Sequence, residues 1–137
     1  MSLHGLMQDV PLLISSLLDY AATRHGSREI VSRTVEGDIH RYTYSDAGRR
    51  AARLANALLK LGVQRGDRVA TVAWNTFRHF EAFYAVSGVG AILHTVNPRL
   101  FDEQIKYIMR HAEDSIVFVD VPFIPLLERL APELPSV

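Results

Sequence analysis

The 137-residue sequence contains no cysteine, and lysine occurs only at positions 60 and 106. The absence of cysteine excludes a disulfide scaffold, a thiolate metal site and a cysteine nucleophile. Neither sign of charge dominates, because 15 Lys and Arg residues balance 15 Asp and Glu residues. The composition therefore gives no reason to expect a nucleic-acid partner. A chain of this length can bury the core of one domain.

Long hydrophobic runs are also missing. A bilayer span needs about 20 consecutive apolar residues, and the best candidate, Val10 to Leu18, is interrupted by Pro11, Ser15 and Ser16. This stretch also lacks the basic region and the cleavage site of a signal peptide. These features are typical of a cytoplasmic protein without a transmembrane segment.

Motifs for metal, dinucleotide or P-loop phosphate binding are not found. The six histidines form no i, i+2 or i, i+4 pair, so no zinc or iron site is indicated. The Gly88-Val89-Gly90 stretch precedes an apolar run instead of following one, unlike a dinucleotide fingerprint. We interpret His94 as a packed core histidine, because no neighbour in the sequence supplies a nucleophile or an orienting acid.

The first half of the chain predicts a helix, a hairpin and a second helix. A first amphipathic helix ends near His25, and its apolar positions are Leu12, Leu13, Ser16, Leu17 and Tyr20. The runs 29–35 and 39–43 flank a glycine-containing turn and predict an antiparallel hairpin. Thr43 and Asp46 resemble a capping box. The following helix ends at Gly62, exposes its arginines, and is expected to bury Ala47, Ala51, Leu54, Ala55, Leu58 and Leu61.

The second half alternates strands and helices. Strands are predicted at 68–73, 91–96 and 115–119, and the first two are apolar enough to be buried on both faces. Asn75 or Thr76 is expected to cap the next helix, whose apolar residues are Phe77, Phe80, Phe83 and Tyr84. A third helix begins near Asp102, and a short last helix spans 123–130.

This alternation predicts an α/β fold in three layers, with β-α-β units on a small, mostly parallel sheet and an appended antiparallel hairpin. Sheets of this kind are usually covered on both faces and contain more strands. At least one edge of the sheet is therefore expected to be unfinished, and we interpret the chain as an incomplete part of a larger domain.

Several short motifs in a fixed order resemble the N-terminal region of AMP-forming acyl-CoA synthetases, particularly the medium- to long-chain fatty-acyl-CoA synthetase branch. They are Arg41-Tyr42-Thr43-Tyr44-Ser45-Asp46, Arg53-Leu54-Ala55-Asn56-Ala57-Leu58-Leu59, Gly66-Asp67-Arg68-Val69-Ala70, Trp74-Asn75, and His94-Thr95-Val96-Asn97-Pro98-Arg99-Leu100-Phe101. The resemblance implies that residues 7–137 are an N-terminal subdomain of the AMP-binding domain, truncated at its C-terminal end. Residues 1–6 are then a leader or a cloning remnant.

The resemblance also implies an activity for the full-length protein. That family converts ATP and a carboxylate to an acyl-adenylate and pyrophosphate, and CoA then attacks to give acyl-CoA and AMP. ATP, CoA, Mg²⁺ and a fatty acid are the implied cofactors and partners, and a homodimer is expected. The family's phosphate loop, magnesium ligands, ribose-binding Asp and catalytic Lys lie later in the chain. We therefore predict no catalytic residue, no metal ligand, no tightly bound cofactor and no activity in this segment.

The resemblance extends to two further positions, of which Arg99 is the candidate for a binding role. Arg99 matches the arginine of the family's Asn-Pro-Arg motif, which in a related ligase lies near the CoA nucleotide phosphates, so a CoA phosphate contact is implied; a loop-anchoring role is the alternative. Trp74 and Asn75 match a position usually held by Pro-Asn, which favours a structural turn. The alternative hypothesis, from a different class of function, is that the chain is a complete non-catalytic α/β module that binds an anionic ligand or mediates oligomerisation.

Overall fold

A three-stranded parallel sheet forms the centre of the molecule. The computed structural model describes residue 5 and residues 8–137. The strands are β3 (Arg68–Val72), β4 (Ile92–Thr95) and β5 (Ile116–Val119), in the order β4-β3-β5. Ala70 pairs with His94 on one side and with Val117 on the other. β3 is therefore central, as its apolar sequence predicts, and four of its five residues are buried.

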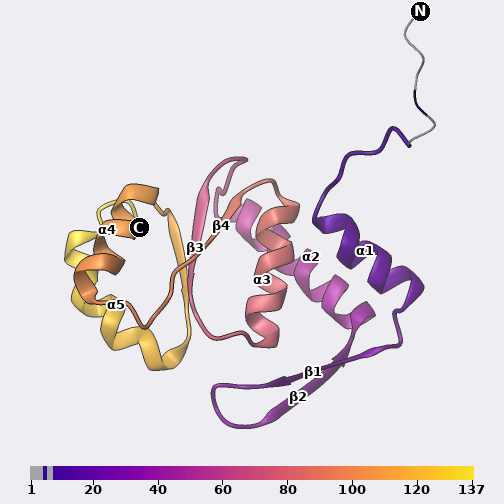
Figure 1. Ribbon diagram of the computed structural model, residues 1–137, viewed down its shortest axis with the longest axis horizontal. Helices are drawn as coiled ribbons and strands as arrows, with labels where there is room; N and C mark the ends of the chain where they lie inside the picture. The colour runs from indigo at the N-terminus through magenta and orange to yellow at the C-terminus, as the bar shows by residue number, and fades with distance from the viewer. Residues whose placement is uncertain (1–4, 6–7) are drawn as a thin grey trace, which may run out of the picture.

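Two helices cover one face of this sheet. They are α2 (Tyr44–Lys60) and α3 (Phe77–Gly88), which lie side by side to the right of β3 in Figure 1. Leu58 of α2 and Val86 of α3 are fully buried against Val69 of β3. Each buried side chain of this size contributes about 1.5–3 kcal/mol through removal of apolar surface from water.

The opposite face is covered by the C-terminal helices. These are α4 (Asp102–Ala112), η1 (Val121–Phe123), α5 (Ile124–Leu130) and η2 (Ala131–Glu133), drawn in orange and yellow in Figure 1. Ile105 and Met109 of α4 are fully buried against Ala70 and Val72 of β3. The predicted three-layer α/β arrangement is thus confirmed.

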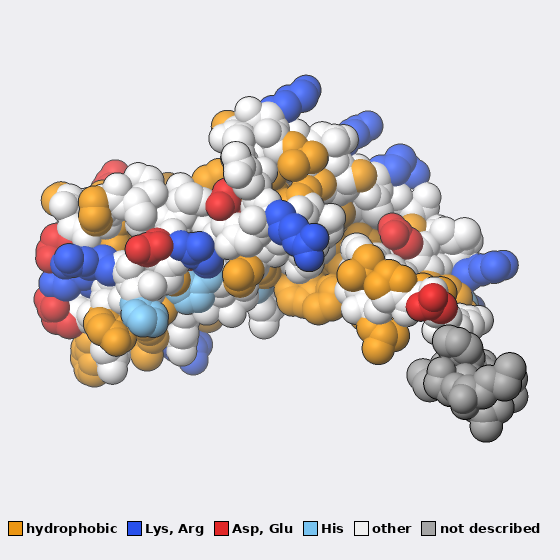
Figure 2. Space-filling view, turned by 90° about the horizontal axis from the view of Figure 1, so that it is seen from above, with side chains coloured by type: hydrophobic (Ala, Val, Ile, Leu, Met, Phe, Trp, Pro, Cys, Tyr) orange, Lys and Arg blue, Asp and Glu red, His pale blue; other side chains and the backbone are white. Residues whose placement is uncertain are grey.

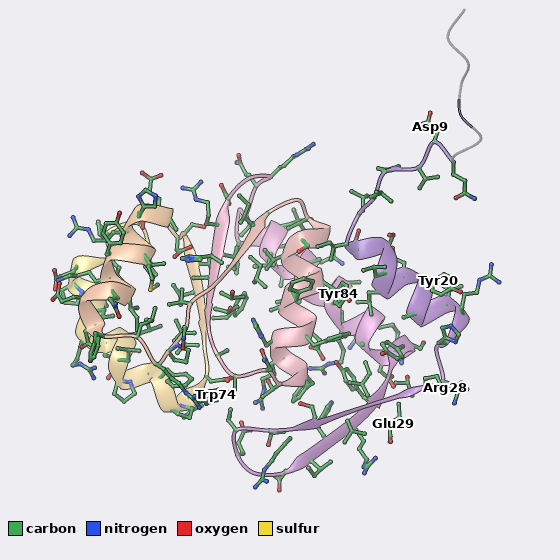
Figure 3. All side chains as sticks on the ribbon, in the orientation of Figure 1. Asp9, Tyr20, Arg28, Glu29, Trp74 and Tyr84 are labelled. Carbon is green, nitrogen blue, oxygen red and sulfur yellow. The ribbon has the colours of Figure 1, made fainter. Side chains whose placement is uncertain are left out.

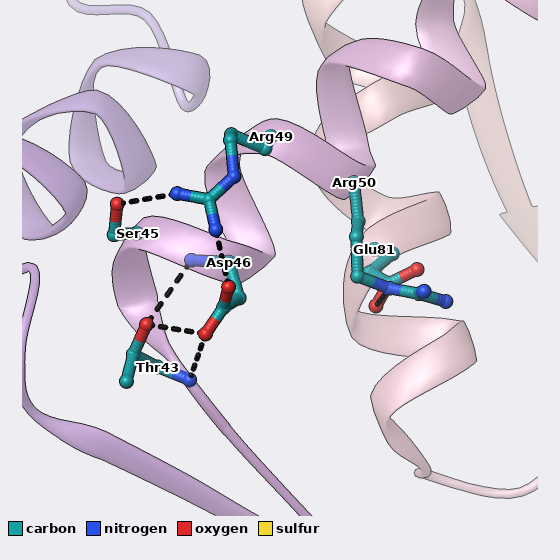
Figure 4. A network of polar contacts seen from close by, with 6 residues as sticks. All are labelled: Thr43, Ser45, Asp46, Arg49, Arg50 and Glu81. Carbon is teal, nitrogen blue, oxygen red and sulfur yellow. Dashed lines mark hydrogen bonds and ion pairs between the residues drawn. The ribbon is translucent and has the colours of Figure 1, made fainter.

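The antiparallel hairpin is a separate two-stranded sheet. It consists of β1 (Glu29–Arg33) and β2 (Ile39–Thr43), and Val31 pairs with Arg41. The predicted capping box is present, because the Thr43 hydroxyl accepts the Asp46 N–H at 3.2 Å and Asp46 Oδ2 accepts the Thr43 N–H at 3.0 Å. Figure 4 shows this network, to which Arg49 adds an ion pair with Asp46. The Thr43 hydroxyl also donates to Asp46 Oδ2 at 2.6 Å, and this bond, together with the one from the Thr43 N–H, lowers the pKa of the Asp46 carboxyl.

An ion pair between residues distant in the sequence links α2 to α3. Arg50 Nε donates to Glu81 Oε1 at 2.6 Å, and the Glu81 side chain is only 7% exposed. Arg50 is exposed, as predicted for the α2 arginines, but it also pairs with a buried carboxylate, which the sequence did not indicate. A carboxylate buried to this degree requires a partner, and the packing of α2 on α3 supplies one that is 31 residues away in the sequence.

The first helix packs differently from the prediction. α1 (Ser15–Arg24) begins after Leu12 and Leu13, and it buries Leu18 in a cluster with Ala47, Ala51 and Tyr42. The predicted apolar positions Leu12, Leu13, Leu17 and Tyr20 are all exposed. Figure 2 shows hydrophobic side chains gathered next to the grey N-terminal residues. The periodicity located the helix, but the face that packs on α2 carries Leu18 and Ala22.

Three further predictions of burial are corrected. Leu61 is 71% exposed because α2 ends at Lys60. Phe83 lies on the outer side of α3 and is exposed. β4 is not buried on both faces, because it is an edge strand whose Ile92 and Thr95 are exposed.

No helix in the described part of the chain is long and apolar enough to cross a membrane. The prediction that residues 1–6 are a leader or a cloning remnant falls, apart from Gly5, outside the described residues.

Candidate functional site

The carboxyl ends of the three parallel strands meet at one edge of the sheet, where open α/β sheets usually bind ligands. The Asp120 N–H, just after β5, donates to Val72 O at 3.1 Å, and the Val96 N–H, just after β4, donates to Thr71 O at 2.9 Å. These bonds extend the sheet beyond its last residues. The chain segments 73–76, 96–99 and 120–123 therefore emerge side by side.

Trp74 is held at the centre of this edge. Its backbone N–H donates to Asp120 Oδ2 at 2.8 Å, and Asp120 is itself buried. The indole ring lies 5.3 Å from the Phe123 ring, centroid to centroid. Figure 3 shows Trp74 at the lower end of the sheet beside α5, away from the core between α3 and the sheet. The indole is 39% exposed, so one part of it packs and another part faces solvent.

Arg99 lies over this indole. Its guanidinium carbon is 5.3 Å from the Trp74 ring centroid, within the range of a cation–π contact. The Arg99 backbone is fixed by its own N–H, which donates to Asn97 Oδ1 at 3.0 Å. No salt bridge joins Arg99 to a carboxylate within residues 5 and 8–137. The structure thus brings the predicted candidate Arg99 into contact with Trp74, which is 25 residues away in the sequence.

His79 connects the end of β3 to the loop that follows. Its Nδ1 lies 3.2 Å from Asn75 Oδ1, and its Nε2 lies 3.1 Å from the Thr71 hydroxyl. Because an amide oxygen can only accept, Nδ1 donates to Asn75, and the neutral ring accepts the Thr71 O–H at Nε2. Burial lowers the pKa of His79, which the charge of Asp120 partly opposes. No motif in the sequence indicated this role.

An open hollow of about 770 Å³ lies beside these groups, between α3 and the loop after β4. Its walls combine aromatic side chains with amides and hydroxyls, namely Asn75, Thr76, His79, Phe80, Phe83, Tyr84, Thr95 and Asn97. A smaller pocket of about 200 Å³ shares His79 and extends to Asp120. Of the aromatic residues that we expected in the core, only Phe77 is buried, whereas Phe80, Phe83 and Tyr84 line this hollow.

A second polar pair lies away from this edge. His94 Nδ1 contacts Asp114 Oδ2 at 2.9 Å, and Asp114, which precedes β5, is completely buried. Burial raises the pKa of Asp114, and the hydrogen bond from His94 opposes this shift. His94 is hydrogen-bonded as the interpretation of a packed core histidine requires, although its side chain is 21% exposed. No neighbour in the sequence orients it, but Asp114, 20 positions away, supplies an acid that sequence proximity did not indicate.

Metal binding has no candidate in this part of the protein. Within residues 5 and 8–137, no group of three or more His, Asp or Glu side chains is arranged to hold a metal ion. The chemistry available at the strand ends is therefore that of a guanidinium, an indole, an imidazole and amides. Such groups bind anions and flat ring systems.

Comparison with known proteins places this geometry in a family. A family model described as AMP-binding enzyme matches residues 18–137. The chain is 47% identical over 133 residues to the 3-methylmercaptopropionyl-CoA ligase of Ruegeria lacuscaerulensis. The matched residues make up 97% of this chain and 25% of that protein. It is also 47% identical over 133 residues to the medium-chain-fatty-acid–CoA ligase of Ectopseudomonas oleovorans, with 97% and 24% covered.

A solved structure supports the same assignment. The fatty acyl CoA synthetase of Mycobacterium tuberculosis superposes with a TM-score of 0.78 at 26% identity, over 85% of this chain and 23% of that one. The chain spans about a quarter of the length of the curated relatives that it matches. Because the family model covers most of the sequence and the fold agrees, the chain belongs to the AMP-binding enzyme family, as a segment from its N-terminal region.

Proposed function

We propose that this chain is the N-terminal segment of a fatty-acyl-CoA synthetase. In the first step of the proposed reaction, a fatty-acid carboxylate attacks the α-phosphate of ATP, which gives an acyl-adenylate and releases pyrophosphate. In the second step, the CoA thiolate attacks the acyl carbon and AMP leaves. The observation that supports this proposal is the match of 97% of the chain, at 47% identity, to CoA ligases of apolar carboxylic acids.

The proposed substrate is a carboxylic acid with an apolar chain. One relative is named for a medium-chain fatty acid and another for 3-methylmercaptopropionate, at the same 47% identity. Both names specify a CoA thioester as the product. We propose that this segment contributes to the part of the reaction that both relatives share.

ATP and Mg²⁺ are proposed to bind outside this segment. Mg²⁺ prefers carboxylate and phosphate oxygens, and the described residues offer no converging carboxylates. When bound, Mg²⁺ would neutralise charge on the phosphates of ATP. The alternative of a complete non-catalytic module is not favoured, because every close relative named above is a much longer CoA ligase.

Arg99 is proposed to contact a phosphate of CoA. The guanidinium is exposed at the ligand-binding edge of the sheet and has no carboxylate partner among the described residues. Its planar fork of donors suits bidentate binding of a phosphate. In the full-length enzyme, we expect Arg99→Ala to raise the KM for CoA while the KM for ATP stays constant. An equal rise of both constants would contradict this role.

Pyrophosphate exchange tests the proposed activity. The full-length protein encoded by the reading frame is expected to exchange labelled pyrophosphate into ATP only when a fatty acid is present, because the adenylation step is reversible. Residues 1–137 alone should catalyse no exchange. Exchange without a fatty acid would contradict the substrate assignment, and exchange by the segment would contradict the placement of the catalytic groups.

Homodimer formation also stays a proposal. β4 and β5 are both edge strands of the parallel sheet, and unpaired strand edges favour association. Sedimentation of the full-length protein at several concentrations measures the oligomeric state. A monomer at all concentrations would contradict the proposal.

A further inference from the structure

We propose that Trp74 is a positioning residue whose indole ring orients Arg99 for an anionic ligand. The inference rests on the proposed role of Arg99 in CoA binding and adds a residue that acts through it. Trp74 does not itself need to touch the ligand. Its ring limits the directions in which the guanidinium can point, and so reduces the entropy that Arg99 loses when a phosphate binds.

The first argument compares the arginines that lie over aromatic rings. Arg50 and Arg78 both lie over the Phe77 ring, at 5.6 and 4.9 Å, and both also pair with glutamates. Part of the charge of each is thus already neutralised within the protein. Arg99 lies over Trp74 at 5.3 Å and, in the described part of the chain, has no carboxylate partner. Among these three arginines, only Arg99 combines a contact with an aromatic ring and a guanidinium that no described carboxylate pairs with.

The second argument concerns the rigidity of the indole. Asp120 accepts the Trp74 N–H at 2.8 Å, and Trp74 O accepts the Thr76 N–H at 2.8 Å, so both backbone polar groups of Trp74 are bonded. Phe123 packs against the ring. Because Asp120 and Phe123 come from the end of β5, the platform is fixed by two strands, whereas Arg99 follows a third. The contact therefore couples all three strand ends.

The third argument is the residue type. The resemblance described above places a proline at the position of Trp74 in many family members. A proline has no N–H to donate to Asp120 and no aromatic face for a guanidinium. The tryptophan in this chain thus creates two interactions that a proline excludes.

A fluorescence experiment tests the contact without any substrate. Trp74 is the only tryptophan of the 137-residue chain, so its emission reports this site alone. A positive charge over the ring concentrates anions, so iodide should quench the fluorescence of Trp74 more strongly in the wild type than in Arg99→Ala. Quenching by neutral acrylamide should not be weaker in Arg99→Ala than in the wild type. Arg53→Ala, which removes an exposed arginine from α2, is the matched control and should behave like the wild type. Equal iodide quenching in Arg99→Ala and the control would overturn the contact.

Kinetics of the full-length enzyme test the function of the contact. Loss of an exposed cation–π contact should raise the KM for CoA about twofold to fivefold in Trp74→Leu, with kcat and the KM for ATP unchanged. Trp74→Phe should recover part of the loss, because it restores a ring. Combined with Arg99→Ala, Trp74→Leu should add nothing, since it acts through the guanidinium.

The outcomes separate the two proposals. If Arg99→Ala leaves the KM for CoA unchanged, the proposed CoA contact of Arg99 fails. If Arg99→Ala raises this KM but Trp74→Leu does not, the contact of Arg99 survives and the positioning role of Trp74 is refuted. The positioning role is also refuted if the two substitutions are additive, or if Trp74→Leu lowers kcat and changes both KM values together.

Discussion

The ion pair between Arg50 and Glu81 provides a quantitative test of how this segment is held together. We predict that Arg50→Ala destabilises the chain substantially more than the loss of an ordinary surface arginine. Glu81 Oε1 accepts a hydrogen bond of 2.6 Å from Arg50 Nε, and the carboxylate is 7% exposed. Removal of Arg50 would leave a buried charge with no cation beside it.

The magnitude follows from the burial of the two partners. Breaking a fully buried pair costs about 3–5 kcal/mol, but the Arg50 side chain is 46% exposed. Water therefore screens the pair, and we reduce the expected cost to about 1–2 kcal/mol. For a domain of this size, such a loss lowers Tm by roughly 3–10 °C. The Arg50 contact with the Phe77 ring, at 5.6 Å, contributes in the same direction.

Urea unfolding at neutral pH, followed by circular dichroism, measures this cost. Arg53→Ala, which removes an exposed arginine from the same helix, should change the free energy of unfolding by less than about 0.5 kcal/mol. Glu81→Gln in the Arg50→Ala background should recover part of the stability, because it removes the uncompensated charge. Equal stability of Arg50→Ala and Arg53→Ala would refute the reasoning.

Three further predictions concern single contacts. Thr43→Ala removes the capping box of α2 and should cost about 1 kcal/mol in urea unfolding; an unchanged midpoint would contradict the cap. Ile105→Val leaves a small cavity at a fully buried position and should cost about 0.5–1.5 kcal/mol by the same assay, whereas a stabilised variant would contradict the packing of α4. Burial lowers the pKa of His79 below its usual 6.5, so the unfolded state binds more protons and stability should fall as the pH falls from about 7 through the folded pKa. His79→Gln should flatten this dependence in thermal melts at pH 5 to 7, and a profile as steep as that of the wild type would contradict the assignment.

Local patterns in the sequence predict the elements of this fold well. The hairpin and the capping box at Thr43 depend on interactions between residues close in sequence, the three parallel strands are indicated by short apolar runs, and each is present. The parallel arrangement also follows from the alternation of strands and helices. Which face of a helix packs is less local. The exposed Leu17 and the buried Leu18 of α1 show that the neighbouring element decides, here through α2.

Contacts between distant residues could not be predicted in the same way. His94 and Asp114 are 20 residues apart, and Arg50 and Glu81 are 31 apart. Each pair is created by strand order and helix packing, which no spacing rule specifies. The exposed state of Ile92 has the same origin, because only the topology shows that β4 is an edge strand.

The candidate site was partly predictable. The Asn-Pro-Arg motif identified Arg99, and the strand-end position of Trp74 was recognised, but their contact depends on three strand ends meeting. No motif in the sequence identified His79, because its contacts with Thr71 and Asn75 form only when α3 packs against β3. The motif thus located the site, and the structure supplied the interactions that shape it.

The stoichiometry of the products tests the central proposal most directly. The full-length protein is incubated with ATP, Mg²⁺, CoA and a fatty acid, and the nucleotides and thioesters are separated and quantified by mass spectrometry. We predict that AMP and acyl-CoA form in equal amounts, and only when fatty acid and CoA are both present. Formation of ADP in place of AMP, or AMP release without any acyl-CoA, would contradict the assignment of this chain to a fatty-acyl-CoA synthetase.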